Sequence, residues 1–374
     1  MSRVFSGIRP SGLLHLGNYL GAIKNWIALQ KAHDCIFAIV DYHAITTPFN
    51  PDELRANVRE VALDYLAVGL DPKRATLMVQ SRVPEHVELG WIFQSISPVS
   101  WFERVPTYKE KIAQHPDYVN LGLLAYPALM AADILIYKAD LVPVGEDQLP
   151  HIEMTNAIAR RFNTMCGTPP LTPPQRGGEA KTISSPARGE VRRGGSNGGT
   201  VFPQVKPLLT PAARIMSLRD PHKKMSKTPD QERLSFVQRS RTKLSLDSDD
   251  SCLFLSDPPE EVRRKIKTAV TDSGREIKAG DDKPALTNLL TIYSEVSGWP
   301  VKKLETRYKG KGYADFKKDL AEAVVKFLEP FQARRKALEK KKGYVERVLN
   351  DGAARARPLA QKTLQEVKRK IGLL

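Results

Sequence analysis

The sequence predicts an α/β protein in which a doubly wound, parallel sheet is followed by an all-helical C-terminal domain. Two observations carry this prediction. In the first 80 residues, apolar runs as short as buried strands alternate with amphipathic patterns of helical spacing. Beyond residue 260 the apolar residues recur with helical spacing, and the faces between them are basic. Strands that alternate with helices form parallel sheets, because each helix carries the chain back to start the next strand.

The first elements follow in β-α-β-α-β order, which is half of a doubly wound fold. Strands are expected where short apolar runs stand alone, and helices where apolar residues recur every three or four positions. The pair Asp71-Pro72 ends the second helix, since proline lacks the N–H that a helix needs. The expected elements are a strand at 4–8, a helix from 17 to about 32, a strand at 35–40, a helix from 51 and a strand at 75–80.

Further elements complete the predicted α/β part. Residues 122–137 are strongly apolar but contain one acid, Asp133, and residues 142–148 form a glycine turn with two acids and an amide. We expect helices at 83–104 and 151–162 and a strand at 213–218. The helix at 83–104 has apolar positions at Val87, Leu89, Trp91, Ile92 and Ile96. The C-terminal helices have apolar stripes at Val262, Ile266 and Val270, at Ala323, Val324, Phe327, Leu328 and Phe331, and at Leu359, Leu364, Val367 and Ile371.

Residues from about 168 to 200 differ in kind from the rest of the chain. They are rich in Pro, Gly, Ser and Arg and have hardly any large apolar side chain, so they cannot bury enough surface to offset the entropy of ordering. We interpret this segment as a low-complexity insertion. It is either an insertion without a function of its own, which we favour, or a basic arm that contacts RNA.

Composition narrows the class of protein. The 374 residues suffice for about two domains, and three widely separated cysteines fit neither a disulfide framework nor a Cys-x-x-Cys metal site. No apolar run reaches the roughly 18 residues of a membrane span. The first strand begins almost at once, which leaves no room for a signal peptide, so a cytoplasmic location is expected. The net charge of +16 favours a polyanionic partner such as nucleic acid.

Two segments have the character of phosphate-binding loops. The first, 5–21, reads as strand, glycine-rich loop and helix N-terminus, and its loop contains His15-Leu-Gly-Asn18. A helix N-terminus offers backbone N–H groups and a partial positive charge to a phosphate, although a junction of this kind can also be plain packing. The second segment, Lys224-Met-Ser-Lys-Thr228, places two ammonium groups on a loop of the same predicted frame. Nothing resembles a Ser-His-Asp or Cys-His catalytic arrangement.

Together these segments resemble the two signatures of class I aminoacyl-tRNA synthetases, His-Ile-Gly-His and Lys-Met-Ser-Lys-Ser. The stretches FSGIRPSG, GNYLGA, IVDYHAIT, LMAADILIY, VPVGEDQ, ARIMSL and AVTDSG resemble the bacterial tryptophanyl enzymes in particular, and the resemblance covers nearly the whole chain. It implies a Rossmann-type catalytic domain at 1–228, with a helical connecting segment at about 105–167, and a helical domain on the tRNA anticodon side at 229–374. It also implies a homodimer formed through the Rossmann half and the segment around 83–104.

The resemblance implies a reaction and a set of residues. L-tryptophan would be activated by ATP, with Mg²⁺ carried by the phosphates and no protein metal site, and transferred to tRNA(Trp). The implied catalytic residues are His15, Asn18, Lys224 and Lys227. The implied ATP-binding residues are Arg9, Pro10, Ser11, Gly17, Asn18, Gly145, Glu146, Asp147, Ile215, Lys224, Met225, Ser226, Lys227 and Thr228. Of the implied tryptophan-binding residues, Asp133 would bind the indole N–H, and Met130, Phe5 and Val144 would pack around the ring. Tyr126, Gln148 and His43 would contact the polar end of the amino acid.

Asp133 also has a physical reading of its own. On a helix, Tyr126, Met130 and Asp133 fall at i, i+4 and i+7 along one face. A carboxylate in so apolar a helix needs a partner, and the indole N–H of tryptophan is one that phenylalanine lacks. The alternatives are a buried ion pair for Asp133, a plain core position for Met130 and a structural role for His43.

Some positions depart from the family pattern, and two other functions remain open. Asn18 replaces the second signature histidine, Arg9 and Thr107 stand where glutamine is common, and Thr228 replaces serine before Pro229. A tyrosine enzyme of the same class is one alternative, which Asp133 disfavours. An inactive, RNA-binding or regulatory relative is the other, although such a protein would be expected to lose the signature donors.

Overall fold

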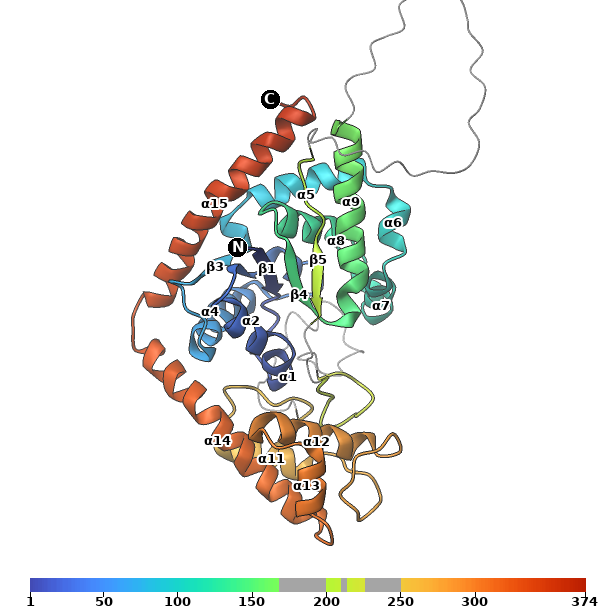
Figure 1. The fold of residues 1–374 in the computed structure, drawn as a ribbon, viewed down its shortest axis with the longest axis vertical. Helices are drawn as coiled ribbons and strands as arrows, with labels where there is room; N and C mark the ends of the chain where they lie inside the picture. Colours follow the sequence, from blue (N-terminus) through green and yellow to red (C-terminus); the bar gives the residue numbers. More distant parts are fainter. Residues whose placement is uncertain (168–199, 210–213, 226–249) are drawn as a thin grey trace, which may run out of the picture.

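The computed structural model describes residues 1–167, 200–209, 214–225 and 250–374. Its centre is a parallel sheet with the strand order β3-β2-β1-β4-β5 (Figure 1). This confirms the predicted doubly wound fold class, and the expected strands at 4–8, 35–40 and 75–80 each agree with an observed strand to within a residue at either end. The strands are β1 Arg3–Ile8, β2 Asp34–Ile39, β3 Ala75–Val79, β4 Leu141–Val144 and β5 Lys206–Leu209.

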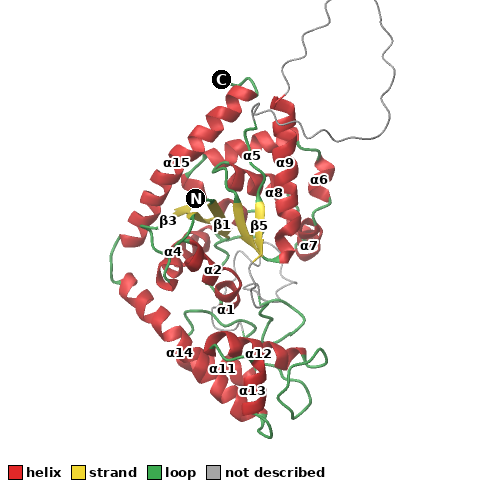
Figure 2. Cartoon of the chain, viewed as in Figure 1, coloured by secondary structure: helices red, strands yellow, loops and turns green. Residues whose placement is uncertain are grey.

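Apolar side chains cover both faces of the sheet. Along β2, Cys35, Phe37 and Ile39 belong to one core cluster, whereas Ile36 and Ala38 belong to the other. This alternation follows from the two-residue period of a strand, and it explains why the strand reads as a continuous apolar run in the sequence. The helices form a layer on each side of the yellow strands (Figure 2).

The helices before residue 168 connect the strands and flank the site. Asn50 caps α4 by accepting hydrogen bonds from the N–H groups of Asp52 and Glu53, and Gly69, with φ of 108°, ends that helix two residues before the predicted stop. The helices are α1 Leu16–Asn18, a π-helical turn Tyr19–Ile23, α2 Lys24–Leu29, α3 Asp41–Ala44, α4 Pro51–Val68, a 3₁₀ turn Gln80–Arg82, α5 Glu85–Ile96, α6 Val99–Glu103, α7 Pro106–Gln114, a 3₁₀ turn Pro116–Tyr118, α8 Leu121–Leu135, a 3₁₀ turn Glu146–Gln148 and α9 Leu149–Gly167.

Two predictions about these elements are wrong. The helix expected at 83–104 is broken into α5 and α6 before Val99, because Ser97 and Pro98 are extended, and its positions Val87 and Trp91 are exposed rather than buried. The strand expected at 213–218 is not one in its described part: Met216 makes a single bridge to Lys224. The fifth strand is instead β5, which precedes that segment.

The C-terminal helices form two groups. Helices α11 to α13 lie with α14 at one end of the molecule, whereas α15 runs back along the sheet beside β3 (Figure 1). Gly352 of α15 packs directly on the backbone of β3, since a Cβ there would lie 1.8 Å from the carbonyl oxygen of Leu77. No side chain other than hydrogen fits at this crossing. The bounds are α11 Pro259–Thr268, α12 Pro284–Ser297, α13 Val301–Arg307, α14 Tyr313–Glu339 and α15 Tyr344–Lys370.

The stripes predicted on α14 and α15 are confirmed. Residues of both stripes belong to the two core clusters or pack against them. On α11 the stripe is correct at Val262 and Ile266, but Val270 follows the end of the helix and is 41% exposed. Among the described residues, none of the helices is long and apolar enough to cross a membrane. The predicted insertion at 168–200 lies outside the described residues except for Thr200.

Candidate functional site

The residues of the candidate site follow the strands at one edge of the sheet. Because the strands are parallel, the segments after β1, β2, β3 and β4 all begin at the same carboxyl edge. The strand order reverses between β1 and β4, and open α/β sheets bind their ligands at such a point. Most of the residues predicted to bind ATP or tryptophan lie in these segments or on α8. The fold therefore brings the predicted site together.

The first signature begins at a capped helix. His15, which is 4% exposed, is the N-cap of α1. The backbone N–H of Asn18 donates to His15 Nδ1 at 3.2 Å, and the backbone N–H of His15 donates to Asn18 Oδ1 at 3.2 Å. Gly17 leaves room for the imidazole, because a Cβ there would lie 3.0 Å from His15 Nδ1. This capping box orients both side chains, so the motif has a structural role in addition to the one predicted from the family.

The second signature lies beside the first. A Cβ added to Gly17 would lie 3.5 Å from the Cβ of Met225, so the two segments are in van der Waals contact. The N–H of Met225 donates to the carbonyl of Ile215 at 3.0 Å, and Lys224 pairs with Met216, so a turn of the chain presents Lys224. Predicted residues Ser226, Lys227 and Thr228 lie outside the described residues. Lys224 and Met225, the described residues of the second signature, therefore lie next to the His15 loop of the first.

The segment after β4 lies next to this turn. Lys224 Nζ is 3.9 Å from Asp147 Oδ1, and the side-chain amide of Gln148 donates to Asp147 Oδ2 at 2.9 Å. Burial raises the pKa of Asp147, but the bond from Gln148 and the charges of Lys224 and Arg214 outweigh it, so that the pKa is lower than usual. A Cβ at Gly145 would lie 2.6 Å from Asp147 Oδ1, so any larger residue there would displace the Asp147 side chain. The neighbouring Glu146 adds a second carboxylate to this turn.

Arg9, in the loop after β1, and Lys111, on α7, form a pair of cations near Tyr126. Burial lowers the pKa of the Lys111 ammonium, and the positive charge of Arg9 lowers it further. Desolvation of the guanidinium also lowers the pKa of Arg9, and the charge of Tyr126 opposes this, whereas the Arg9 residue as a whole is exposed. Two like charges that disfavour each other create a place for an anion. The sequence analysis identified Arg9 but missed Lys111, whose only signal is its position on a basic helix next to Thr107.

Asp133 is the centre of a buried polar network. Its residue is 2% exposed, and three donors surround its carboxylate. His43 Nε2 lies 2.8 Å from Oδ2, Gln80 Nε2 donates to Oδ1 at 2.7 Å, and His86 Nδ1 lies 2.6 Å from Oδ1. The other nitrogen of His86 lies 2.6 Å from the hydroxyl of Tyr137, which fixes the orientation of that ring. These partners come from α3, which follows β2, from the turn that follows β3, and from α5.

The network keeps Asp133 charged. Burial raises its pKa, but the hydrogen bonds and charges of His43 and His86 outweigh the burial, so the pKa lies below the usual 3.8. A carboxylate can accept about four hydrogen bonds, and these partners supply three. One more donor can therefore be accommodated without displacing any of them. The buried pairing left open as an alternative in the sequence is present, and it leaves one acceptor position of the carboxylate unused by these three partners.

Aromatic and apolar side chains lie near this carboxylate. Phe5 stacks on Tyr137 with ring centroids 5.8 Å apart, and Phe5 and Val144 are buried in the core cluster against which Met130 packs. The ring of His43 meets that of Tyr126 edge-on, with centroids 6.3 Å apart. Of these residues, Phe5, Met130 and Val144 are the ones predicted around an indole ring.

Two further polar side chains surround the Tyr126 hydroxyl at the predicted polar end. The hydroxyl of Tyr126 lies 2.7 Å from His151 Nε2, and Thr107 Oγ1 lies 3.3 Å from the same nitrogen. His43 lies between this group and Asp133, since its ring meets Tyr126 edge-on and its Nε2 lies 2.8 Å from Asp133 Oδ2. Burial lowers the pKa of His151, so its ring is held neutral more strongly than usual.

Several residues of the site were missed in the sequence, among them His151, which lies against Tyr126 and Thr107. Gln80 ends the third predicted strand, and His86 falls at helical spacing with the apolar residues Leu89 and Phe93 of α5, where a buried polar side chain signals a partner. Lys111 is another site residue that the sequence analysis missed. Within the described ranges, no three His, Cys, Asp or Glu residues come together as metal ligands. The arrangement can bind a polyanion at the signatures and a flat apolar ligand with one N–H donor beside Asp133.

Comparisons with known proteins identify the family of the chain. The family model of class I tRNA synthetases (W and Y) matches residues 1–329. Tryptophan–tRNA ligase of Bacillus anthracis is 43% identical over 374 residues, which cover 100% of this chain and 98% of that protein. The corresponding ligase of Bacillus subtilis is 42% identical over 371 residues, or 99% and 97% of the two chains.

Solved structures give the same result. Tryptophanyl-tRNA synthetase from Mycoplasma pneumoniae has a TM-score of 0.77 and 32% identity, with 100% of this chain and 98% of that chain covered. The enzyme from Campylobacter jejuni complexed with ADP and tryptophan has a TM-score of 0.74 and 28% identity, with 99% of each chain covered. This chain therefore belongs to the class I tRNA synthetases of the tryptophan and tyrosine group.

Proposed function

We propose that the chain ligates L-tryptophan to tRNA(Trp) in two steps, through tryptophanyl-adenylate, in protein synthesis. The observation that carries the proposal is the ionised, buried Asp133 carboxylate beside the apolar side chains of Phe5 and Met130. Full-length relatives named tryptophan–tRNA ligase support it, as does a structural neighbour whose title includes ADP and tryptophan. Asp133 accepts the indole N–H as its fourth hydrogen bond, which selects tryptophan over phenylalanine.

In the first step, a carboxylate oxygen of tryptophan attacks the α-phosphorus of ATP. The bond to the bridging oxygen of the β-phosphate breaks, and pyrophosphate leaves with its electron pair. No enzyme nucleophile is needed, because alignment and charge stabilisation supply the catalysis. Arg9, Lys111 and Lys224, together with Lys227, neutralise the phosphates, and the side chain of Asn18 donates to them beside His15. The remaining predicted ATP residues line the nucleotide: Pro10, Ser11, Gly17, Gly145, Glu146, Asp147, Ile215, Met225, Ser226 and Thr228.

In the second step, a terminal ribose hydroxyl of the tRNA attacks the carbonyl carbon of the adenylate, and AMP leaves. The net charge of +16 suits this polyanionic partner. We assign residues 1–228 to catalysis and the helices of 229–374 to the anticodon side of the tRNA. The location that fits this role is the cytoplasm.

Mg²⁺ belongs to the nucleotide in this proposal. The side chains assigned to the phosphates are cationic or amide donors, which suit phosphate oxygens and not a metal ion. Mg²⁺ prefers hard oxygen ligands and keeps several waters. It is therefore held by phosphate oxygens and water, and it supplies charge neutralisation when bound.

Amino-acid-dependent exchange of pyrophosphate into ATP tests the function. Exchange with tryptophan and with no other amino acid is the expected result. Exchange with tyrosine and not with tryptophan would favour the related tyrosine enzyme, and an absence of exchange with every amino acid would favour an inactive relative.

A homodimer is the second part of the proposal. Val87, Trp91 and Val99 are 43%, 68% and 58% exposed on α5 and the start of α6, and large apolar groups on neighbouring elements mark interaction surfaces. We place the dimer interface there. Sedimentation of the wild-type chain should give a dimer, and Trp91→Glu should shift it toward monomer.

Lys224→Ala is expected to lower kcat/KM for ATP in the exchange reaction by about ten- to hundredfold, because one charge at the transferring phosphates is lost. Tryptophan affinity, measured by fluorescence titration, should stay unchanged. Lys223→Ala is the matched control, since Lys223 is the neighbouring exposed lysine. Equal effects of the two substitutions would contradict the assignment of Lys224.

A further inference from the structure

Residues 250–257, called here the bridging segment, contact both signature regions of the site. On one side, the segment pairs with the first signature: Leu16 N–H donates to the carbonyl of Leu253 at 2.8 Å, and Leu255 N–H donates to the carbonyl of Leu14 at 2.9 Å. His15 and Phe254 form the antiparallel bridge between these two bonds. The backbone on both sides of His15 is thus held by a segment distant in sequence.

On the other side, the bridging segment holds the turn that presents Lys224. The N–H of Leu218 donates to the carbonyl of Ser251 at 2.9 Å, and the N–H of Ser217 donates to the carbonyl of Lys223 at 2.8 Å. The guanidinium of Arg219, just before the turn, is paired with the Asp250 carboxylate. The geometry of the Lys224 turn therefore depends on where Asp250 and Ser251 lie.

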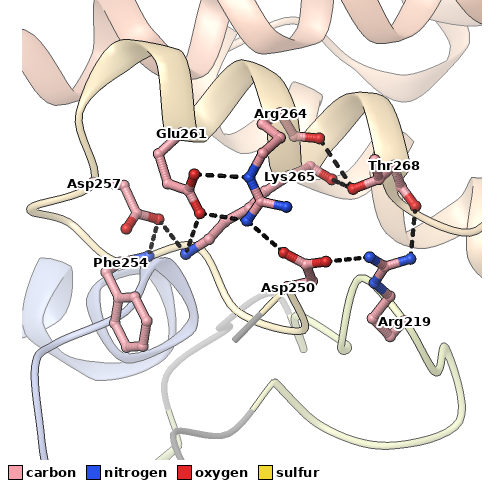
Figure 3. A network of polar contacts seen from close by, with 8 residues as sticks. All are labelled: Arg219, Asp250, Phe254, Asp257, Glu261, Arg264, Lys265 and Thr268. Carbon is pink, nitrogen blue, oxygen red and sulfur yellow. Dashed lines mark hydrogen bonds and ion pairs between the residues drawn. The ribbon is translucent and has the colours of Figure 1, made fainter. Parts of the chain in front are cut away.

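Helix α11 fixes the bridging segment at both ends (Figure 3). At the start of the bridging segment, the Asp250 carboxylate accepts a hydrogen bond from the guanidinium of Arg264 at 2.5 Å. Arg264 also binds Glu261, one helical turn earlier in α11. At its end, Asp257 Oδ2 accepts from the Phe254 N–H at 2.9 Å and from the ammonium of Lys265 at 2.8 Å. Adjacent residues of one helix thus hold the two ends of the segment.

The Lys265 contact is a buried one. Lys265 is 1% exposed, and its ammonium lies 4.7 Å from the centre of the Phe254 ring. Burial raises the pKa of Asp257, and the bond and charge of Lys265 oppose this. Gln332 of α14 donates to the carbonyls of both Leu255 and Asp257. A buried charge with such specific partners costs desolvation, and core packing alone does not require it.

We infer that α11, through Arg264–Asp250 and Lys265–Asp257, is a positioning element that sets the distance between the His15 loop and the Lys224 turn. The inference rests on the proposed function, since it assigns the network to the alignment of ATP. None of these four residues touches the substrate. They act through the bridging segment on the residues that do.

Substitutions at the two ends of the segment test this positioning role. In full-length protein, Asp250→Asn and Asp257→Asn should each lower kcat/KM for ATP in exchange by about ten- to hundredfold, the scale expected when reacting groups shift by about 1 Å. Tryptophan affinity should change by less than about twofold, because the Asp133 site is built from other elements. Arg263→Met is the matched control, since Arg263 lies on the same helix but pairs with exposed Glu322.

Hydrogen exchange separates positioning from general destabilisation. Asp257→Asn should speed amide exchange in peptides containing Leu16 and Leu255, Asp250→Asn should do so in those containing Leu218, and Arg263→Met should do neither. The double variant Asp257→Asn with Lys265→Met should be less impaired than Lys265→Met alone, because the single variant leaves a buried carboxylate without its cation.

The outcomes distinguish this inference from the proposed function. If the wild-type chain supports no pyrophosphate exchange with any amino acid, the proposed function fails. The ATP affinity of the same variants, measured by calorimetry, then still tests the positioning role of α11. Unchanged use or binding of ATP in folded Asp250→Asn and Asp257→Asn would overturn the inference. A loss of tryptophan affinity as large as the loss for ATP would also overturn the inference. So would a loss of the same size for ATP in Arg263→Met.

Discussion

Replacing Asp133 with alanine is expected to lower kcat/KM for tryptophan in pyrophosphate exchange by about 10²–10³-fold. The substitution removes the acceptor of the indole N–H, and a hydrogen bond to a charged group contributes about 1.5–3 kcal/mol. It also leaves the donors of His43, Gln80 and His86 without their acceptor, so the site relaxes away from its binding geometry. The measurement is steady-state exchange at saturating ATP.

Phenylalanine and a second aspartate provide the controls for this prediction. Phenylalanine has no ring N–H, so any weak activity with it should change much less than that with tryptophan, and the ratio of the two should collapse. Asp140→Ala is the matched variant, because Asp140 accepts the Arg3 N–H in an exposed contact at the start of β1. Normal tryptophan binding by a folded Asp133→Ala protein would contradict the specificity proposal.

The pH dependence of stability gives a separate check on Asp133. Its pKa in the folded chain is depressed below 3.8, because the bonds and charges of His43 and His86 outweigh its burial. The folded state therefore binds fewer protons than the unfolded state near that pH, and the stabilisation is complete above pH 3.8. It should be lost as the pH falls through the lowered pKa. The difference in unfolding free energy between wild type and Asp133→Ala should follow that course.

The parts of the fold that the sequence predicts are those fixed by local pattern. The strand from Asp34 to Ile39 is buried on both faces, so its apolar run is unambiguous, and Asp133 is recognisable because a single acid in an apolar helix is costly. The short strand β5 could not be predicted in the same way. It contains Pro207, and its side chains are mostly exposed, so it has neither length nor alternation to mark it.

The partners of Asp133 could not be predicted for a different reason. Gln80 and His86 are ordinary polar residues at the end of a strand and the start of a helix, and only the sheet order and the packing of α5 on α8 place them on one carboxylate. The return of α15 to the sheet is similar. Its apolar stripe predicts a buried face, but nothing in the stripe says that Gly352 packs on β3.

Arg335→Met is expected to destabilise the folded chain by about 3–5 kcal/mol, the usual effect of removing one partner from a buried ion pair. Arg335 of α14 is 9% exposed and binds Asp64 and Glu60 of α4, and Asp64 is 1% exposed. Asp64 Oδ2 also accepts the N–H of Leu14 at 3.4 Å, next to the first signature. Urea unfolding at neutral pH measures the effect.

The loss should depend on pH with a definite sign. Burial raises the pKa of Asp64 and Arg335 opposes this, so in Arg335→Met the folded pKa rises further above the unfolded value of 3.8. The folded variant then takes up more protons than the unfolded chain as the pH falls, which stabilises it. Its deficit relative to wild type should therefore be largest at neutral pH and shrink toward pH 3.8. Arg263→Met, which breaks an exposed pair with Glu322, should change stability little at either pH. A deficit in Arg335→Met that is small, or constant with pH, would show that Asp64 does not depend on this arginine.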